Sequence, residues 1–163
     1  MLLKEAGDLS VSDLPDAIDW RERGIVSEVK NQGSCGSCYA FSSVAALESH
    51  LALKQDNWRS PHISEQQIID CAQAFDTNGC SGGLPSHVFQ YIKYNGGIMT
   101  EFSYPYVGKD QNCSFVYSEG PYPQANGIAT TVPGGSVNLT AGDEMALKVA
   151  LATKGPVSVA YQV

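Results

Sequence analysis

The stretch Lys30-Asn31-Gln32-Gly33-Ser34-Cys35-Gly36-Ser37-Cys38-Tyr39-Ala40-Phe41 decides the fold of this chain. It begins as a glycine-punctuated loop, which lets the backbone turn tightly and approach another segment closely. It then continues into an apolar pattern of 3.6-residue period, which predicts a helix from Cys38 to about Leu53. Cys38 therefore lies at a predicted helix start, where free N–H groups and the helix dipole stabilise a thiolate. Because the thiolate is the attacking form of cysteine, this position suits nucleophilic chemistry.

Length and composition describe an ordinary globular protein. The 163 residues, 43% of them hydrophobic, suffice for one folded domain and part of a second. The formal net charge of −7 argues against a nucleic-acid partner, because phosphate contacts need clustered lysine and arginine. No apolar run is long enough to span a bilayer, so no membrane partner is predicted. The first residues also lack the apolar core of a secretory signal.

Five cysteines predict a disulfide framework with one thiol left over. If Cys38 is the free thiol, the other four allow three pairings, and the sequence alone does not choose among them. Disulfides persist in an oxidising compartment, or in one that is entered through it. The alternative is a cytosolic protein with five reduced cysteines in its core.

Three more helices and one strand are predicted downstream: a helix from Ser64 to about Cys71, one from Pro85 to Asn95, one from Gly142 to Lys154, and a half-buried strand from Val157 to Val163. Ser64 with Gln67 three residues later gives the first helix a capping box. Proline at the first position starts the second, and acidic residues start the third. The strand is predicted from the alternation of apolar and polar residues.

Gln32 to Phe41 resembles the active-site segment of the papain-like cysteine peptidases, for which the pattern Cys-Gly-[Ser/Ala]-Cys-[Trp/Tyr] is specific. Other segments follow in the family's order, so that the resemblance covers about Leu14 to Val163: Asp19-Trp20-Arg21, Ser64-Glu65-Gln66-Gln67, Asp70-Cys71, Gly79-Cys80-Ser81-Gly82-Gly83, Tyr104-Pro105-Tyr106 and Gly155-Pro156-Val157-Ser158-Val159. Residues 82–86 and 94–99 are most similar to the cathepsin H and cathepsin L branches. Tyr39 is a small departure, since tryptophan is commoner there.

The resemblance implies an α+β fold of two domains with a cleft along their junction. Residues 1–13 are interpreted as a leader or propeptide remnant, residues 14–125 as a helical domain that carries the nucleophile, and residues 126–163 as the start of a strand-rich domain. The disulfides that the resemblance implies are Cys35–Cys80 and Cys71–Cys113. No cofactor is expected, and no metal either, because a zinc site needs a second close pair of cysteine or histidine.

Attack on a peptide bond by a thiol needs a thiolate, a base, donors for the oxyanion and a cleft. Cys38 would supply the thiolate and form the acyl-enzyme, while its backbone N–H and the Gln32 amide would donate to the oxyanion. The substrate-binding residues that the resemblance implies are Gly36, Gly82, Gly83, Leu84, Pro85 and Ala160. The glycine pair would offer a bare backbone edge to an extended substrate, and the last three would line an apolar pocket. Without the resemblance, Gln32 is a polar loop residue, the glycine pair a turn, and Leu84 and Pro85 core.

The family's base is a histidine oriented by an asparagine, expected about 130–150 residues after the cysteine and so beyond Val163. The three histidines present, His50, His62 and His87, are interpreted as surface residues. The sequence is therefore read as the N-terminal part of a cysteine peptidase, inactive by itself. The expected partners are polypeptide substrates and a propeptide or an inhibitor of the cystatin type, in an endolysosomal or secreted setting.

Four points stay open. A chain that keeps Cys38 without the base is also compatible with an inert binding module or with half of a split enzyme. Cys35-Gly36-Ser37-Cys38 at a helix start is compatible with a thiol–disulfide oxidoreductase, although no βαβ pattern precedes it and three cysteines would be unexplained. The sequons at Asn138 and Asn112 are candidate glycosylation sites, and the choice between endopeptidase and aminopeptidase is not decided.

Overall fold

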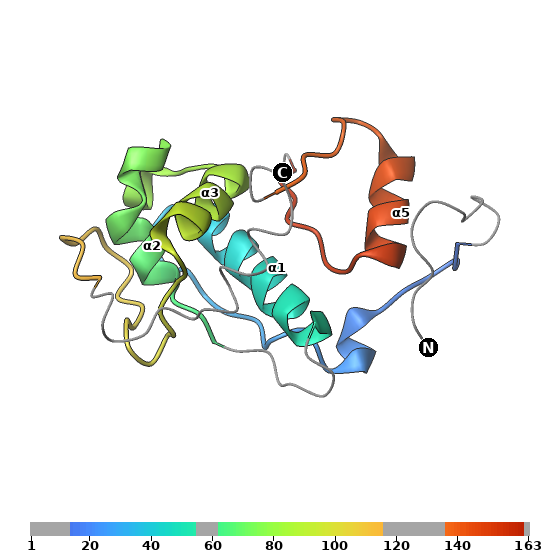
Figure 1. Ribbon diagram of the computed structural model, residues 1–163, viewed down its shortest axis with the longest axis horizontal. Coiled ribbons are helices and arrows are strands. Elements are labelled where there is room, and N and C mark those ends of the chain that lie inside the picture. The colour runs from blue at the N-terminus through green and yellow to red at the C-terminus, as the bar shows by residue number, and fades with distance from the viewer. Residues whose placement is uncertain (1–13, 55–61, 116–135, 162–163) are drawn as a thin grey trace.

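The computed structural model describes residues 14–54, 62–115 and 136–161 (Figure 1). These residues contain four α-helices: α1 (Cys38–Lys54), α2 (Glu65–Cys71), α3 (Pro85–Asn95) and α5 (Glu144–Thr153). Three short 3-10 helices accompany them: η2 (Trp20–Arg23), η3 (Gln73–Phe75) and η4 (Gly79–Ser81). The four helices predicted from the sequence are thus confirmed, with ends that agree within two residues.

Helix α1 is the central element, and α2 and α3 pack against it (Figure 1). Its predicted apolar face is almost completely buried: Ala40, Val44, Leu47 and Leu51. This face forms one core with Ile68 of α2 and with Val88 and Ile92 of α3. Because burial of such side chains is the main favourable term in folding, this core fixes the position of α1 and of Cys38 at its first turn.

The start of α2 uses only half of the predicted capping box. Ser64 Oγ accepts the N–H of Gln67 at 3.0 Å, as the pattern predicts. The Gln67 side chain does not return to Ser64; it donates to the Tyr91 hydroxyl at 2.8 Å and accepts the Met99 N–H at 2.7 Å. The Ser64 N–H donates instead to the Met99 carbonyl at 3.0 Å. The start of α2 is thereby tied to α3 and to the chain that follows α3.

Buried polar side chains of α2 hold the irregular segment 104–114. Gln66 makes hydrogen bonds of 2.8–3.2 Å to three backbone groups of residues 107–109. The Asp70 carboxylate accepts one backbone N–H and the Tyr104 hydroxyl, each at 2.9 Å. Buried polar groups are costly unless they are paired, so these bonds give the segment a fixed path without regular secondary structure.

Two disulfides close this helical part of the chain. Cys35 pairs with Cys80, and Cys71 with Cys113, at Cα–Cα distances of 4.7 and 4.8 Å. These are the pairs that the family resemblance implies. Cys38 is left as the free cysteine, and it is exposed.

The strand prediction is wrong for residues 157–161, which adopt no strand; residues 162 and 163 lie outside the described part. A strand requires a neighbour to complete its backbone hydrogen bonds. The only pairing of this kind within the described residues is an isolated antiparallel bridge between Ile63 and Thr100. The alternation of apolar residues indicates a face suited to burial, but it does not supply the partner.

Helix α5 stands apart from α2 and α3 (Figure 1). Asp143 caps its start, where Oδ1 accepts the Ala146 N–H at 2.8 Å. The indole N–H of Trp20 donates to the Leu151 carbonyl at 3.0 Å, which ties α5 to η2. The expected leader, residues 1–13, and the expected domain boundary after residue 125 both lie outside the described residues, so the division into domains stays a prediction.

Candidate active site

Cys38 is the first residue of α1, and its side chain is exposed. The carbonyl of Ser37 accepts the N–H groups of Ala40 and Phe41 at 2.9 and 3.1 Å, which closes the first turn. No described hydrogen bond uses the N–H of Cys38 itself. The free N–H and the positive end of a 17-residue helix therefore favour negative charge at this point.

Gln32 is held against the same turn. Its side-chain nitrogen donates one hydrogen to the Cys35 carbonyl at 2.8 Å. A glutamine amide carries two hydrogens, and no described hydrogen bond uses the second. The loop and the helix start thus present two donors, one hydrogen of the Gln32 amide and the Cys38 N–H, that no described hydrogen bond uses.

Gly36 lies in the loop before α1 (residues 30–37), at the point where this loop meets η4. Its N–H donates to the Cys80 carbonyl at 2.9 Å, and a Cβ added there would come within 2.5 Å of that oxygen. Glycine is therefore required for this close approach. Since the N–H is already used, only the carbonyl of Gly36 remains for a bound substrate.

The two glycines after η4, Gly82 and Gly83, differ in how their backbone groups are used. Gly82 has a φ of +116°, and both of its backbone groups are hydrogen-bonded within the protein. Its N–H donates to the Gly79 carbonyl at 3.4 Å, and its carbonyl accepts the Asn78 N–H at 2.8 Å. Gly83 has neither of its backbone groups in a described hydrogen bond. Of the two, Gly83 is thus the residue that offers a free edge for an extended peptide.

Tyr39, next to Cys38, joins α1 to the glycine pair. Its hydroxyl donates to the Gly79 carbonyl at 3.0 Å, and a Cβ on Gly83 would lie 2.7 Å from its ring. Burial raises the pKa of Tyr39 to about 12. The ring therefore fixes the distance between the start of α1 and the free backbone of Gly83.

The residues expected to line the apolar pocket are accessible. Leu84 is 56% exposed, which rules out the reading of this residue as core, and Pro85 begins α3. Ala160 is exposed in the chain that follows α5. A pocket formed by all three stays a prediction.

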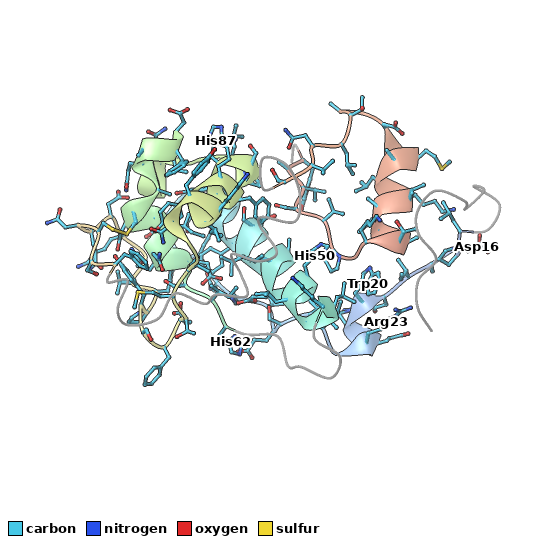
Figure 2. All side chains as sticks on the ribbon, in the orientation of Figure 1. Asp16, Trp20, Arg23, His50, His62 and His87 are labelled. Carbon is cyan, nitrogen blue, oxygen red and sulfur yellow. A yellow bond between two sulfur atoms is a disulfide. The ribbon has the colours of Figure 1, made fainter. Side chains whose placement is uncertain are left out.

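The three histidines lie in separate parts of the molecule (Figure 2). None of them has a described interaction with Cys38. His62 is exposed as predicted, and His87 Nδ1 lies 3.3 Å from the Asp76 carbonyl. The surface prediction holds only in part for His50, which is half-buried. Its Nε2 lies 3.0 Å from the Pro156 carbonyl, and burial lowers its pKa. His50 is covered because the chain after α5 returns across the second half of α1.

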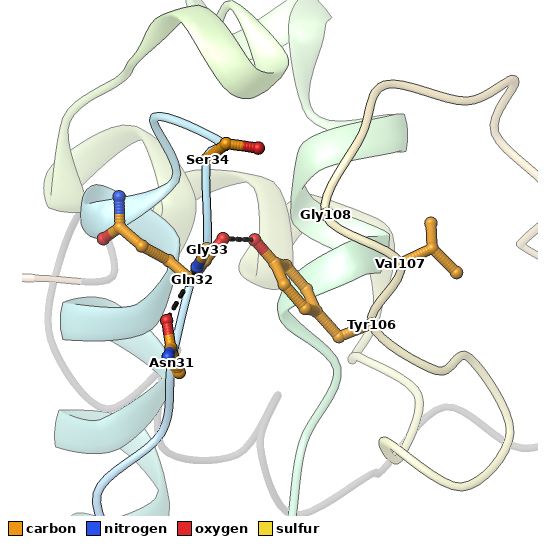
Figure 3. Close-up of a pocket in the computed structure, with 7 residues that line it drawn as sticks. All are labelled: Asn31, Gln32, Gly33, Ser34, Tyr106, Val107 and Gly108. Atoms are coloured by element: carbon orange, nitrogen blue, oxygen red, sulfur yellow. Dashed lines mark hydrogen bonds between the residues drawn. The ribbon is translucent and has the colours of Figure 1, made fainter.

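A pocket of about 330 Å³ lies beside the Gln32 loop (Figure 3), lined by Asn31, Gln32, Gly33, Ser34, Tyr106, Val107 and Gly108. Tyr106 enters it from the segment that α2 holds, and its hydroxyl donates to the Gln32 carbonyl at 2.6 Å. Sequence reasoning assigned Tyr106 no role. No local signal could have found this bond, because it joins residues 74 positions apart.

Within the described residues, no group of histidine, cysteine, aspartate or glutamate side chains is arranged to hold a metal ion. In the same part of the chain, no helix has the length and apolar content needed to cross a bilayer.

Comparisons with known proteins bear on the whole chain. The family described as papain family cysteine protease matches residues 14–163. Pro-cathepsin H of Mus musculus is 49% identical over 150 residues, covering 91% of this chain and 42% of its own length. An aleurain-like thiol protease of Arabidopsis thaliana is 48% identical over 161 residues, covering 99% of this chain and 42% of its own. The chain thus spans less than half the length of these relatives.

Solved structures agree with the sequence relatives. Procathepsin L 3 from the larval midgut of Tenebrio molitor superposes with a TM-score of 0.69 at 38% identity, over 87% of this chain and 43% of that structure. The proform of the ragweed pollen cysteine protease Amb a 11 gives a TM-score of 0.59 at 43% identity, over 67% of this chain and 32% of that one. The fold is therefore the papain-like α+β fold, and the chain belongs to the papain family of cysteine proteases.

Proposed function

We propose that the protein containing this chain is a peptidase that hydrolyses polypeptides through a covalent acyl-enzyme on Cys38. The observation that carries the proposal is the free, exposed Cys38 at the first turn of α1, with its own N–H and one Gln32 hydrogen unused. An acceptor-free N–H beside a thiol supplies two of the groups that acyl transfer requires, a nucleophile and an oxyanion donor.

The residues of this chain would supply the nucleophile and the oxyanion donors of the reaction. The Cys38 thiolate attacks the substrate carbonyl carbon, and the negative charge moves to the carbonyl oxygen, where the two donors bind it. The carbon–nitrogen bond then breaks, the amine leaves with the proton that the base took from the Cys38 thiol, and the acyl group stays on sulfur as a thioester. Water releases the acid and restores the thiol.

The proton carrier is proposed to lie outside this chain. His50 and His87 each donate a ring N–H to a backbone carbonyl, and His62 is exposed in a loop. We therefore assign the base to a histidine, oriented by an asparagine, in residues that the longer relatives contain and this chain does not. Residues 1–13 are proposed as a propeptide remnant, which the naming of relatives as proforms and pro-cathepsins supports.

The finer assignments follow the same reasoning. An extended substrate would pair with the free backbone of Gly83, and Leu84, Pro85 and Ala160 would contact its apolar side chain. Two disulfides and two exposed sequon residues, Asn112 and Asn138, support passage through an oxidising compartment to an endolysosomal or secreted location. Inhibitors of the cystatin type are proposed to bind the same edge.

The test is turnover of a fluorogenic peptide by the complete protein. Cys38→Ala is expected to abolish turnover, and Gln32→Ala to lower kcat by about 10²- to 10³-fold, since it removes one oxyanion donor. Gln90→Ala, at an exposed glutamine on α3, is the matched control and should change nothing. If the complete wild-type protein binds peptides without cleaving them, it is an inert binding module and the proposal is wrong.

A further inference from the structure

We propose that Tyr106 is a positioning residue of the oxyanion site, whose hydroxyl sets the spacing between the Cys38 N–H and the Gln32 amide. The inference rests on the proposed function, because it takes these two groups as the oxyanion donors. It concerns a residue that contacts neither the nucleophile nor, in the mechanism above, the substrate.

The hydroxyl of Tyr106 lies between Gln32 and Ser37, two residues of the loop before α1. It is 2.6 Å from the Gln32 carbonyl and 3.0 Å from the Ser37 Oγ. A carbonyl only accepts, and a phenol has one hydrogen to give. The Tyr106 hydrogen is therefore donated to Gln32, and Ser37 is the donor to Tyr106. The alternative acceptor for Ser37, the Cys35 carbonyl at 3.4 Å, is at the long limit of a hydrogen bond.

These two bonds act on both donors at once. Ser37 is fully buried, and its carbonyl carbon is bonded to the nitrogen of Cys38, so fixing Ser37 fixes one donor. The other bond fixes the backbone of Gln32, whose amide is further restrained by the Cys35 carbonyl. An oxyanion is bound well only when both donors lie about 2.7–3.1 Å from it. A shared hydroxyl keeps that separation constant while the substrate changes shape.

Tyr106 is held by contacts outside the loop that it positions. Its ring stands edge-on to Phe41 of α1, with centroids 5.0 Å apart and planes at 81°. Its N–H donates to Glu101 at 2.7 Å, and the next two residues are fixed by Gln66 of α2. A support anchored on α1 and α2 can hold a loop, whereas a side chain anchored only in that loop could not.

Tyr106→Phe in the complete enzyme tests this role, because it keeps the ring contact with Phe41 and removes only the hydroxyl. We expect kcat to fall about 10-fold with KM changed less than about 2-fold, as for a group that matters only in the transition state. In a Gln32→Ala background the same change should lower kcat less than it does in the wild type, since only the Cys38 N–H is left to be positioned. If the two effects multiply in full, Tyr106 does not act through Gln32 and the inference is wrong.

Tyr104→Phe is the matched control. Tyr104 lies in the same segment, is 5% exposed, and loses a comparable hydroxyl bond, to Asp70 at 2.9 Å. It should lower the melting temperature and leave kcat unchanged. If Tyr106→Phe behaves in the same way, its role is only structural.

A second measurement separates the inference from the proposed function. If the complete wild-type protein shows no peptidase activity, the function has failed, and the side-chain amide resonances of Gln32 decide the role of Tyr106. Tyr106→Phe, and not Tyr104→Phe, should move these resonances together with the Cys38 N–H resonance. Unchanged resonances would overturn the inference whatever the activity.

Discussion

The helical unit, residues 14–54 and 62–115, and the C-terminal segment, residues 136–161, are stabilised in different ways. The helical unit has a continuous apolar core, two disulfides and a network of buried polar side chains. In the C-terminal segment only Thr153 and Gly155 are buried. One region is held by its interior, and the other by a few contacts with its neighbour.

Those contacts are specific and few. Trp20 bonds the Leu151 carbonyl, His50 lies at the Pro156 carbonyl, and the hydroxyls of Ser42 and Ser158 share a hydrogen bond. Regions with little buried apolar surface open at a lower free energy than the core. We therefore expect the nucleophile, Gln32 and Gly83 to keep their arrangement when the C-terminal segment has already opened.

The largest expected effect comes from breaking Cys71–Cys113 by Cys71→Ala with Cys113→Ala. This bond closes a sequence separation of 42 residues, for which the chain-entropy relation gives a loss of about 4 kcal/mol in the free energy of unfolding. The loss should be confined to the helical unit and be measurable by denaturant unfolding followed by circular dichroism.

Cys38→Ala is the control, because its exposed thiol contributes no core packing and should leave the unfolding free energy unchanged. Hydrogen exchange at α5 completes the test. If opening of α5 becomes easier by the same 4 kcal/mol, the two regions form one cooperative unit and the comparison fails.

A smaller effect is expected where the C-terminal segment rests on α1. Gly155 has a φ of +126°, and a Cβ there would lie 2.7 Å from Leu53 Cδ1 and 3.3 Å from His50 Cε1. Gly155→Ala therefore combines backbone strain with a steric clash and should cost about 2 kcal/mol. Hydrogen exchange should show this as easier opening of α5, with the amides of α1 to α3 unchanged.

Gly142→Ala isolates the backbone term, since Gly142 also has a positive φ, +78°, but no atom within 4 Å of an added Cβ. It should cost only about 1 kcal/mol. Equal effects of the two substitutions would show that the contact with α1 contributes nothing to holding the segment.

The same contrast explains how much of the fold was predictable. Helices α1, α2, α3 and α5 were predicted because their signals are local, such as the Ser64 cap and the proline at the start of α3. The strand after Gly155 failed because pairing depends on a segment elsewhere in the chain. The disulfide pairs came from family resemblance, since four cysteines by themselves allow three arrangements.

In the candidate site, too, the features with a local sequence signal were predictable and those that depend on distant contacts were not. Cys38 at a helix start, and the need for glycine at position 36, can be argued from the loop-to-helix pattern. The bond between Tyr106 and Gln32 and the burial of His50 arise from contacts between distant segments. Contacts of this kind produce no periodic pattern in the sequence from which they could be predicted.

The smallest expected effect concerns a buried charge cluster that only the helical unit possesses. Lys30 Nζ lies 2.8 Å from Glu48 Oε1 and 2.7 Å from Glu65 Oε1, and the two carboxylates are 0% and 2% exposed. Glu48 Oε2 has no hydrogen-bond partner in the described residues. Burial raises the pKa of Glu65 despite the opposing charge of Lys30, while the two glutamates raise the pKa of Lys30 despite its own burial.

The raised pKa of Glu65 makes the helical unit more stable in mild acid. A carboxyl whose folded pKa exceeds its unfolded value contributes stability that is complete below the unfolded pKa and is lost as the pH rises through the folded pKa. Burial raises the pKa of Glu101 as well, so it acts in the same direction. Between pH 7 and pH 5 we expect a gain of less than about 1 kcal/mol.

Glu65→Gln should flatten this dependence, because the amide oxygen still accepts from Lys30 but takes up no proton. Thermal melts of wild type and variant from pH 5 to pH 7 measure it, with Glu22→Gln at an exposed position as the control that should not change the slope. If Glu65→Gln keeps the wild-type slope while Glu101→Gln removes it, the proton binds beside Tyr106 and not at the Lys30 cluster. The acid stability of the helical unit would then be coupled to the loop that carries Gln32, through the Glu101–Tyr106 bond.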